Sequence, residues 1–235
     1  MTGAFAPLVT CEHASHRVPP EVDLGVEEAI LRSHVSYDRG AKEIAIALAE
    51  ELGAPLHLGA HTRLLVDLNR REESPAVIVE ESWGVVVPGN FALDAAAREA
   101  RIARWHRPYR HAARSDALRL AEAGGCFHLS IHSFDPSLDP DTRCFDAGVL
   151  FDPSREPERT FAEALAEALA ARGHEVRLNE PYAGTPEGLT SWLREQIEAA
   201  RYVGIEIEAC HRWMDRPGAH EAFARDLAEA VRALT

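Results

Sequence analysis

Apolar residues recur along the chain with two alternating periods. Short apolar runs of strand length are followed by longer stretches in which apolar residues recur at helical spacing. The runs predicted to form strands are Phe5–Thr10, Ala54–Ala60, Cys126–Ile131, Phe145–Phe151, Glu175–Leu178 and Tyr202–Ile207. The stretches predicted to be helical are Val26–Val35, Ala41–Leu52, Leu93–Glu122, Thr160–Arg172, Gly188–Ala200 and Glu221–Leu234. This alternation predicts an α/β fold in which right-handed crossovers build a mainly parallel mixed sheet flanked by helices.

Two regions have a less regular pattern. Between Ser74 and Asn90, the runs Val77–Val79 and Val85–Val87 are candidate strands around a Trp-Gly pair. The long helical stretch that begins at Leu93 is expected to be interrupted at Pro108, because proline lacks the backbone N–H that a helix needs. The sequence contains no internal repeat, linker or low-complexity segment, so we expect residues 1–235 to form a single domain.

Charge and composition narrow the class of protein. The formal net charge of −13 argues against nucleic acid as a partner, since binding to phosphates needs a basic surface. No apolar run approaches the ~20 residues that a membrane helix requires, and the N-terminus lacks the features of a signal peptide. We therefore expect a cytoplasmic protein without membrane contacts. The four cysteines are too far apart to form a CxxC pair and are expected to be reduced thiols: Cys11, Cys126, Cys144 and Cys210.

Side chains able to do chemistry lie where the first, third and last predicted strands end: His13, His132 and Glu206. Because the carboxyl ends of parallel strands meet at one edge of a sheet, these groups are expected to converge. Two imidazoles and a carboxylate are the composition of an open zinc site. The absence of an HExxH helix disfavours a helical zinc protease, and Ser130 and Ser133 lack the GxSxG elbow of a serine hydrolase. From composition alone, an ordinary surface histidine remains an alternative.

Five motifs, taken together and in order, resemble those of the N-formylglutamate amidohydrolase family. They are Cys11–Ser15, Tyr37–Ala41, Arg63–Arg70, Ser130–Phe134 and Asn179–Tyr182, and the resemblance extends from about residue 7 to about residue 210. The family is grouped with zinc-carboxypeptidase-like hydrolases, whose relatives include aspartoacylase and succinylglutamate desuccinylase. The resemblance implies a fold of the zinc-carboxypeptidase type, one Zn²⁺ ion, and a small N-acyl amino acid as substrate.

The resemblance assigns the metal ligands position by position. His13 matches the first ligand and His132 the last. The relatives usually supply an acid three residues after the first histidine, but that place is occupied here by His16. The first acid at the start of a clear helix is Asp38, which we favour as the third ligand, with His16 as the alternative. A simple helix-capping role for Asp38 also remains open.

The resemblance also implies a binding site for the substrate. Arg63, Asn69 and Arg70 match the residues that receive the substrate carboxylate, and a guanidinium is well suited to that task. Arg63 is also implied to stabilise the negative charge that develops on the acyl oxygen. Tyr182 is a candidate substrate contact or a packed loop aromatic, and Asp67 is expected to orient Arg63 or Arg70.

The match places the general base at Glu206, in the sequence Val-Gly-Ile-Glu. Glu208 lies on the same face of the strand and is the alternative base. The implied reaction is hydrolysis of the amide bond of an N-acyl amino acid. We expect the acyl group to be formyl, as in N-formyl-L-glutamate. The alternatives are a deacylase of the same fold that acts on another N-acyl amino acid or peptide-like amide, and a non-catalytic protein that binds carboxylates.

Overall fold

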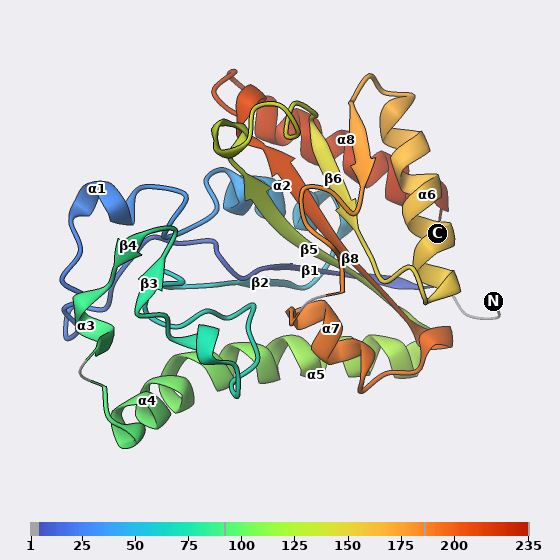
Figure 1. The fold of residues 1–235 in the computed structure, drawn as a ribbon. Helices are drawn as coiled ribbons and strands as arrows, with labels where there is room; N and C mark the ends of the chain where they lie inside the picture. The colour runs from blue at the N-terminus through green and yellow to red at the C-terminus, as the bar shows by residue number, and fades with distance from the viewer. Residues whose placement is uncertain (1–4, 92, 186, 235) are drawn as a thin grey trace.

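A six-stranded sheet runs through the centre of the computed structural model, which describes residues 5–91, 93–185 and 187–234 (Figure 1). Its strands, in the order β2-β1-β5-β8-β6-β7, are Leu56–Leu58, Ala6–Cys11, Cys126–Phe134, Tyr202–Cys210, Ala147–Leu150 and Val176–Leu178. The first four are mutually parallel, β6 is antiparallel to β8, and β7 is parallel to β6. The predicted α/β class and mainly parallel mixed sheet are confirmed.

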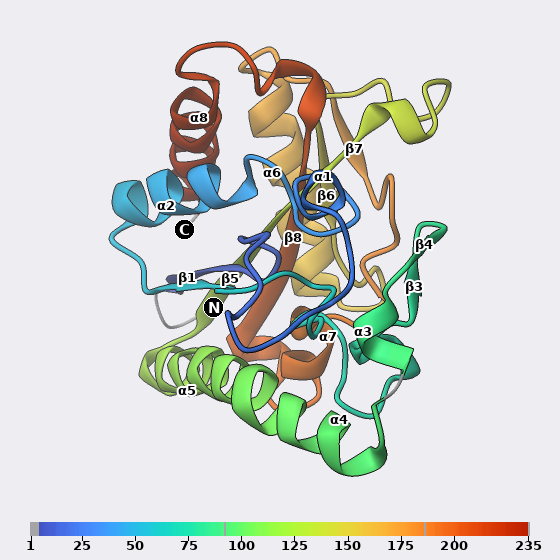
Figure 2. The ribbon, with the colours of Figure 1, turned by 90° about the vertical axis from the view of Figure 1, so that its left-hand side faces the viewer.

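Helices cover both faces of the sheet. On one face lie α2, α6 and α8, and on the other lie α5 and α7 (Figure 2). Their bounds are Ala41–Leu52, Glu156–Ala170, Ala219–Leu234, Arg107–Ala123 and Leu189–Arg194. Every residue of β5 is buried, as expected for a central strand between two helical layers. No helix in the described part of the chain has the length and apolar character needed to span a bilayer.

Helix α2 has the predicted bounds because its sequence specifies both ends. Ile44 and Leu48 are fully buried on its inner face. Gly53 ends the helix in the left-handed conformation that favours glycine. Gly40 precedes the helix with φ of 80°, and a Cβ atom there would lie 2.6 Å from the sulfur of Met214. This tight turn fixes the position of Asp38, two residues earlier.

A smaller set of short elements packs beside the carboxyl ends of β1 and β5 (Figure 1). It comprises α1 at Glu28–Leu31, β3 at Glu81–Ser82, β4 at Val85–Val86, α3 at Pro88–Phe91 and α4 at Ala95–Arg101. These elements enclose a separate apolar cluster that includes Leu64, Leu65, Val77 and Ile78. Single 3₁₀ turns occur at Pro75–Val77, Pro136–Leu138, Ala199–Arg201 and His211–Trp213.

Three local predictions differ from the structure. The predicted helix Val26–Val35 is reduced to the four residues of α1, and the predicted helix Gly188–Ala200 to the six residues of α7. Val77–Val79 is not a strand, because its valines pack into the separate apolar cluster from a 3₁₀ turn and a loop. The expected interruption of the long helix takes the form of a π-helical segment, Ile102–His106, that ends directly before α5, in whose first turn Pro108 lies.

Candidate active site

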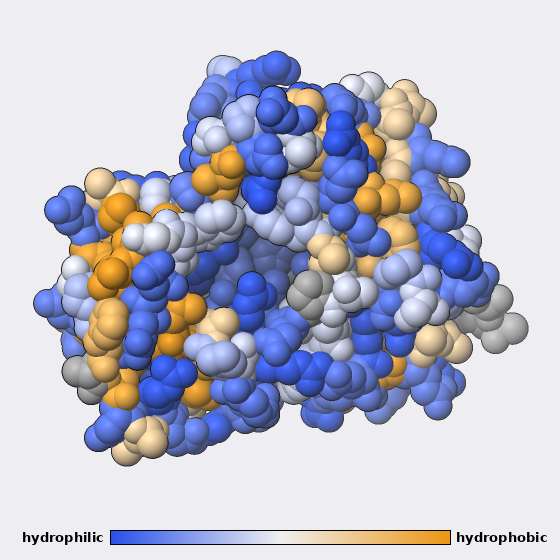
Figure 3. Space-filling model, viewed as in Figure 1, coloured by the Kyte–Doolittle hydropathy of each residue, from blue (hydrophilic) through white to orange (hydrophobic). Residues whose placement is uncertain are grey.

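A cavity of about 240 Å³ opens at the carboxyl ends of β1, β5 and β8. Figure 3 shows it as a hollow lined by hydrophilic residues. It brings together the residues predicted to carry the chemistry, and its lining includes His13, Asp38, Arg63, Asn69, Arg70, His132, Tyr182, Glu206 and Glu208. These side chains come from strands, loops and the start of a helix that are far apart in the sequence. The edge of the sheet brings them together.

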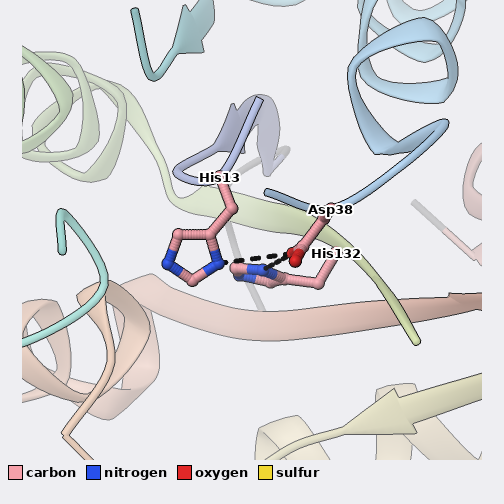
Figure 4. A group of neighbouring side chains, drawn as sticks. All are labelled: His13, Asp38 and His132. Carbon is pink, nitrogen blue, oxygen red and sulfur yellow. Dashed lines mark hydrogen bonds and ion pairs between the residues drawn. The ribbon is translucent and has the colours of Figure 1, made fainter. Parts of the chain in front are cut away.

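Three of these side chains form a group suited to a metal ion. One ligand atom from each of His13, Asp38 and His132 lies within 4.8 Å of the others, and all three side chains are buried. Asp38 Oδ2 lies 2.8 Å from His132 Nδ1 and 3.3 Å from His13 Nδ1 (Figure 4). The Asp38 backbone N–H donates to the His13 carbonyl, which holds the two residues together. His16, the alternative ligand, instead packs against the ring of Tyr37.

A carboxylate lies behind each imidazole. His13 Nε2 is 2.7 Å from Asp67 Oδ1, and His132 Nε2 is 3.1 Å from Glu12 Oε2. In both rings the Nδ1 atom is therefore the one that faces Asp38. Carboxylates in this outer position orient histidine ligands and strengthen them as donors. Asp67 was expected to orient an arginine, but it accepts hydrogen bonds from His13 and from the Asn69 backbone instead.

Glu12 is a site residue that the sequence reasoning missed. Its carboxylate is buried and accepts hydrogen bonds from Ser130 Oγ at 2.6 Å and from the Tyr109 hydroxyl at 3.0 Å, in addition to its contact with His132. Thr10 pairs with Ser130 in the sheet, and two residues further along in each strand direction the side chains of Glu12 and His132 are in contact. The available signal was an acid at the end of an apolar strand, but its partner depends on the strand order.

These contacts shift the pKa values of the site in opposite directions. Burial would raise the pKa of Glu12, but the hydrogen bond and charge of His132 outweigh it and lower the pKa well below its ordinary value. Burial opposes the charged form of His132, yet Glu12 raises its pKa to about 9. Burial and the nearby Arg63 lower the pKa of His13 to about 4. The two imidazoles, whose centroids are 5.1 Å apart, thus have different protonation preferences.

The two predicted arginines have different surroundings. The Arg63 guanidinium pairs with Asp38 Oδ1, and its buried Nε has no hydrogen-bond partner in the part of the chain that the structure describes. Among the described residues, Arg70 makes no ion pair with a carboxylate, and its one side-chain hydrogen bond is a long one, 3.4 Å, to the carbonyl of Asn69. The Arg70 backbone carbonyl is held by His106 Nε2 and Arg110 Nη1, each at 2.8 Å. Arg70 therefore presents an available cation on a fixed backbone.

Asn69 and Tyr182 complete the polar wall of the cavity. Asn69 Oδ1 accepts the Leu189 backbone N–H at 2.7 Å, which leaves the Asn69 amino group 3.4 Å from His132 Nε2. The Tyr182 hydroxyl accepts a hydrogen bond from Arg143 Nη1 at 3.0 Å, and the Arg143 guanidinium also lies over the tyrosine ring. Tyr182 is thus a fixed cavity residue, and Arg143 is a support that the sequence did not indicate.

The two candidate bases lie on β8 and both face the cavity. Thr190 Oγ1 donates to Glu206 Oε1 at 2.5 Å, and a Cβ atom on Gly188 would lie 2.8 Å from the same oxygen. Glu208 pairs with His132 in the sheet, and its buried Oε2 has no hydrogen-bond partner within residues 5–91, 93–185 and 187–234. Burial raises the pKa of Glu208 to about 7, although His132 opposes the rise. The structure thus supplies one anchored and one unpartnered carboxylate.

The donor set fits a divalent cation. Two imidazole nitrogens and a carboxylate oxygen converge, as in zinc sites that keep a position open for substrate. The carboxylates of Glu206 and Glu208 add negative charge to the same cavity, and the Arg63 guanidinium is already paired. A cation at the His13–Asp38–His132 group would offset this excess.

Comparison with known proteins identifies the family. A family model described as N-formylglutamate amidohydrolase matches residues 6–213. The chain belongs to the N-formylglutamate amidohydrolase family. It is therefore an amide-hydrolysing enzyme.

Comparison with individual proteins agrees with this assignment. The chain is 28% identical to an N-formylglutamate deformylase of Pseudomonas aeruginosa, over 99% of this chain and 90% of that protein. A gene product of Agrobacterium tumefaciens of known structure has 30% identity and a TM-score of 0.84, over 99% and 92% of the two chains. The N-formylglutamate amidohydrolase of Ralstonia eutropha has the same fold, with 19% identity and a TM-score of 0.75 over 99% and 94%.

Proposed function

We propose that this enzyme hydrolyses the amide bond of N-formyl-L-glutamate to formate and glutamate, with one Zn²⁺ ion held by His13, Asp38 and His132. The observation that carries the proposal is the convergence of those three ligand atoms beside a cation, Arg70, that no carboxylate of the described residues neutralises. The family, and the Pseudomonas relative named as an N-formylglutamate deformylase, support N-formylglutamate as the substrate.

In this proposal the metal ion would activate the formyl carbonyl and the attacking water. A zinc ion bound at the three residues would act as a Lewis acid towards the formyl carbonyl and would favour ionisation of water. Asp67 and Glu12 keep the Nδ1 atoms of the two histidines directed at that position. Binding of the ion would require little rearrangement of the protein, because the three ligand residues already lie close together.

Glu206 accepts the proton of the attacking water and passes it to the departing amine. Its position in the Gly-Ile-Glu sequence matches the family base, and the Thr190 hydrogen bond fixes one carboxylate oxygen while leaving the other for the proton. Gly188 leaves room for this carboxylate next to the cavity. Glu208 is the second carboxylate on the same face and remains the competitor for the role.

Two arginines interact with the negatively charged groups of the substrate and of the transition state. Arg63 lines the cavity and contacts Asp38 of the metal group, so its guanidinium would stabilise the oxyanion that develops from the formyl oxygen. Arg70 binds the substrate carboxylate, with the Asn69 amide beside it, and this anchoring holds the amide bond next to the metal group. Tyr182 contacts the bound substrate through its ring or hydroxyl.

The test is a substrate panel measured on the purified chain before and after metal removal. We expect N-formylglutamate to be hydrolysed with a higher kcat/KM than N-acetylglutamate or N-succinylglutamate. Removal of metal with a chelator should abolish turnover, and added Zn²⁺ should restore it. Equal rates with and without metal would reject the zinc site, and binding of N-formylglutamate without turnover would support a carboxylate-binding protein instead.

A further inference from the structure

An exposed tryptophan stands at the mouth of the cavity. Trp83 lies at the tip of the β3–β4 hairpin, lines the cavity, and is 54% exposed. Its ring meets that of His34 edge-on, with centroids 5.8 Å apart and planes at 80°. A second exposed apolar side chain, Leu138, lines the same cavity from the 3₁₀ turn at Pro136–Leu138. The polar cavity therefore has an apolar rim, which we define as Trp83 and Leu138.

The backbone at the tip of the hairpin is unfavourable for a tryptophan. Trp83 and Gly84 form a two-residue turn in which both φ angles are positive, 52° and 76°. Such turns favour Asn-Gly or Gly-Gly, since a positive φ is unfavourable for a large side chain. Strain of this kind is found mainly at functional sites, where other interactions make use of the residue.

The charges inside the cavity determine which part of the substrate reaches the rim. Arg63 is paired with Asp38, so Arg70 is the cation available to one substrate carboxylate. Glu206 and Glu208 repel a second carboxylate from the interior. With one carboxylate at Arg70 and the formyl group at the metal site, the amino-acid side chain is the part left to extend towards the mouth.

We propose that Trp83 is a specificity-determining residue that packs, together with Leu138, against the aliphatic part of the substrate's amino-acid side chain. This inference rests on the proposed function and deepens it. The apolar rim selects N-formyl amino acids with long side chains, such as glutamate and leucine, over N-formylglycine. The distal carboxylate of glutamate then lies beyond the rim in solvent, so the rim does not require a charge there.

The experiment compares N-formylglutamate, N-formylleucine and N-formylglycine as substrates of the wild type, Trp83→Asn and Val86→Thr. Asparagine suits the left-handed turn, so Trp83→Asn should fold with an unchanged or higher melting temperature. We expect it to lower kcat/KM for the glutamate and leucine substrates about ten-fold and to leave N-formylglycine within about two-fold. Val86 is exposed on the same hairpin but does not line the cavity, so Val86→Thr should change none of the three.

A binding measurement separates this inference from the proposed reaction. Free leucine and free glycine are titrated calorimetrically into the wild type and Trp83→Asn. Weaker leucine binding with unchanged glycine binding supports the rim even if the wild type hydrolyses none of the three substrates, which would reject only the proposed function. Equal leucine binding by both proteins, or equal loss of kcat/KM for all three substrates, overturns the inference.

Discussion

The side chains of Glu12 and His132 are in contact at the carboxyl ends of β1 and β5, with Glu12 Oε2 3.1 Å from His132 Nε2. Ser130 and Tyr109 donate hydrogen bonds to the same carboxylate and hold it in one orientation. The imidazole is thereby fixed with Nδ1 towards Asp38. The candidate metal group consequently depends on Glu12, a residue that does not itself line the cavity.

Replacing Glu12 by glutamine should weaken metal binding without removing a ligand. The amide cannot provide the charge that orients His132, so we expect the affinity for Zn²⁺ to fall about 10- to 100-fold. Competition with a chromophoric chelator measures this affinity. Tyr109→Phe is the matched control: it removes the hydroxyl that contacts the other Glu12 oxygen and the His57 carbonyl, leaves the Glu12 charge in place, and should have a smaller effect. Unchanged zinc affinity in Glu12→Gln would show that the contact does not position the ligand.

The pair Glu206→Gln and Glu208→Gln distinguishes the two candidate bases. Glutamine keeps the shape of the side chain but cannot take up a proton, so Glu206→Gln should retain zinc and lower kcat by at least ~100-fold. Glu208→Gln should retain most of kcat. Stopped assays on N-formylglutamate, with metal content measured on the same samples, provide the test. A large loss in Glu208→Gln alone would move the base to Glu208.

Arg70→Ala should affect substrate binding more than the chemical step. Because Arg70 is the available cation in the cavity, its loss should raise KM about 100-fold with a smaller change in kcat. The neighbouring Arg71 pairs with Glu195 and does not line the cavity, so Arg71→Ala is the control and should behave like the wild type. Equal KM values for the two variants would contradict the anchoring role of Arg70.

The stability of the fold should fall as the pH decreases from about 6.5 to about 4. His128 is fully buried between the Thr10 and Tyr202 hydroxyls, and burial lowers its pKa to about 4. In that window the unfolded chain binds a proton that the folded chain does not, so the contribution present above pH 6.5 is lost on acidification. For this one group the loss is on the order of 3 kcal/mol.

Urea unfolding at a series of pH values measures this dependence. His128→Gln should reduce the fall in unfolding free energy between pH 6.5 and 4, because the titrating group is gone. His111→Gln, at an exposed position on α5, should leave the fall unchanged. If both variants lost stability on acidification as steeply as the wild type, other groups would be responsible for the acid sensitivity.

The local sequence pattern was sufficient to predict elements in which buried residues recur at one regular spacing. Helix α2 has its predicted bounds because Ile44 and Leu48 repeat at helical spacing and Gly53 ends the helix. The pattern failed where short segments pack into the separate apolar cluster. Val77–Val79 resembles a strand in composition, but β propensity depends on a neighbouring strand, and none is available there.

The site residues that come directly after a strand could be predicted from the sequence. His13 and His132 were placed at one edge by the parallel sheet, and the structure brings them together with Asp38. The partners of the carboxylates were not predictable, because they depend on register and loop geometry. Glu12 reaches His132 only through the pairing of β1 with β5, and Asp67 reaches His13 through a loop whose path no periodicity describes.

Zinc stoichiometry tests the central claim most directly. Elemental analysis of the wild type, Asp38→Ala and His16→Ala, each loaded with zinc and freed of excess metal, compares the favoured third ligand with its alternative. The account predicts about one zinc per chain in the wild type and in His16→Ala, and a loss of nearly all zinc in Asp38→Ala. Full zinc occupancy in Asp38→Ala, or its loss in His16→Ala, would contradict a site formed by His13, Asp38 and His132.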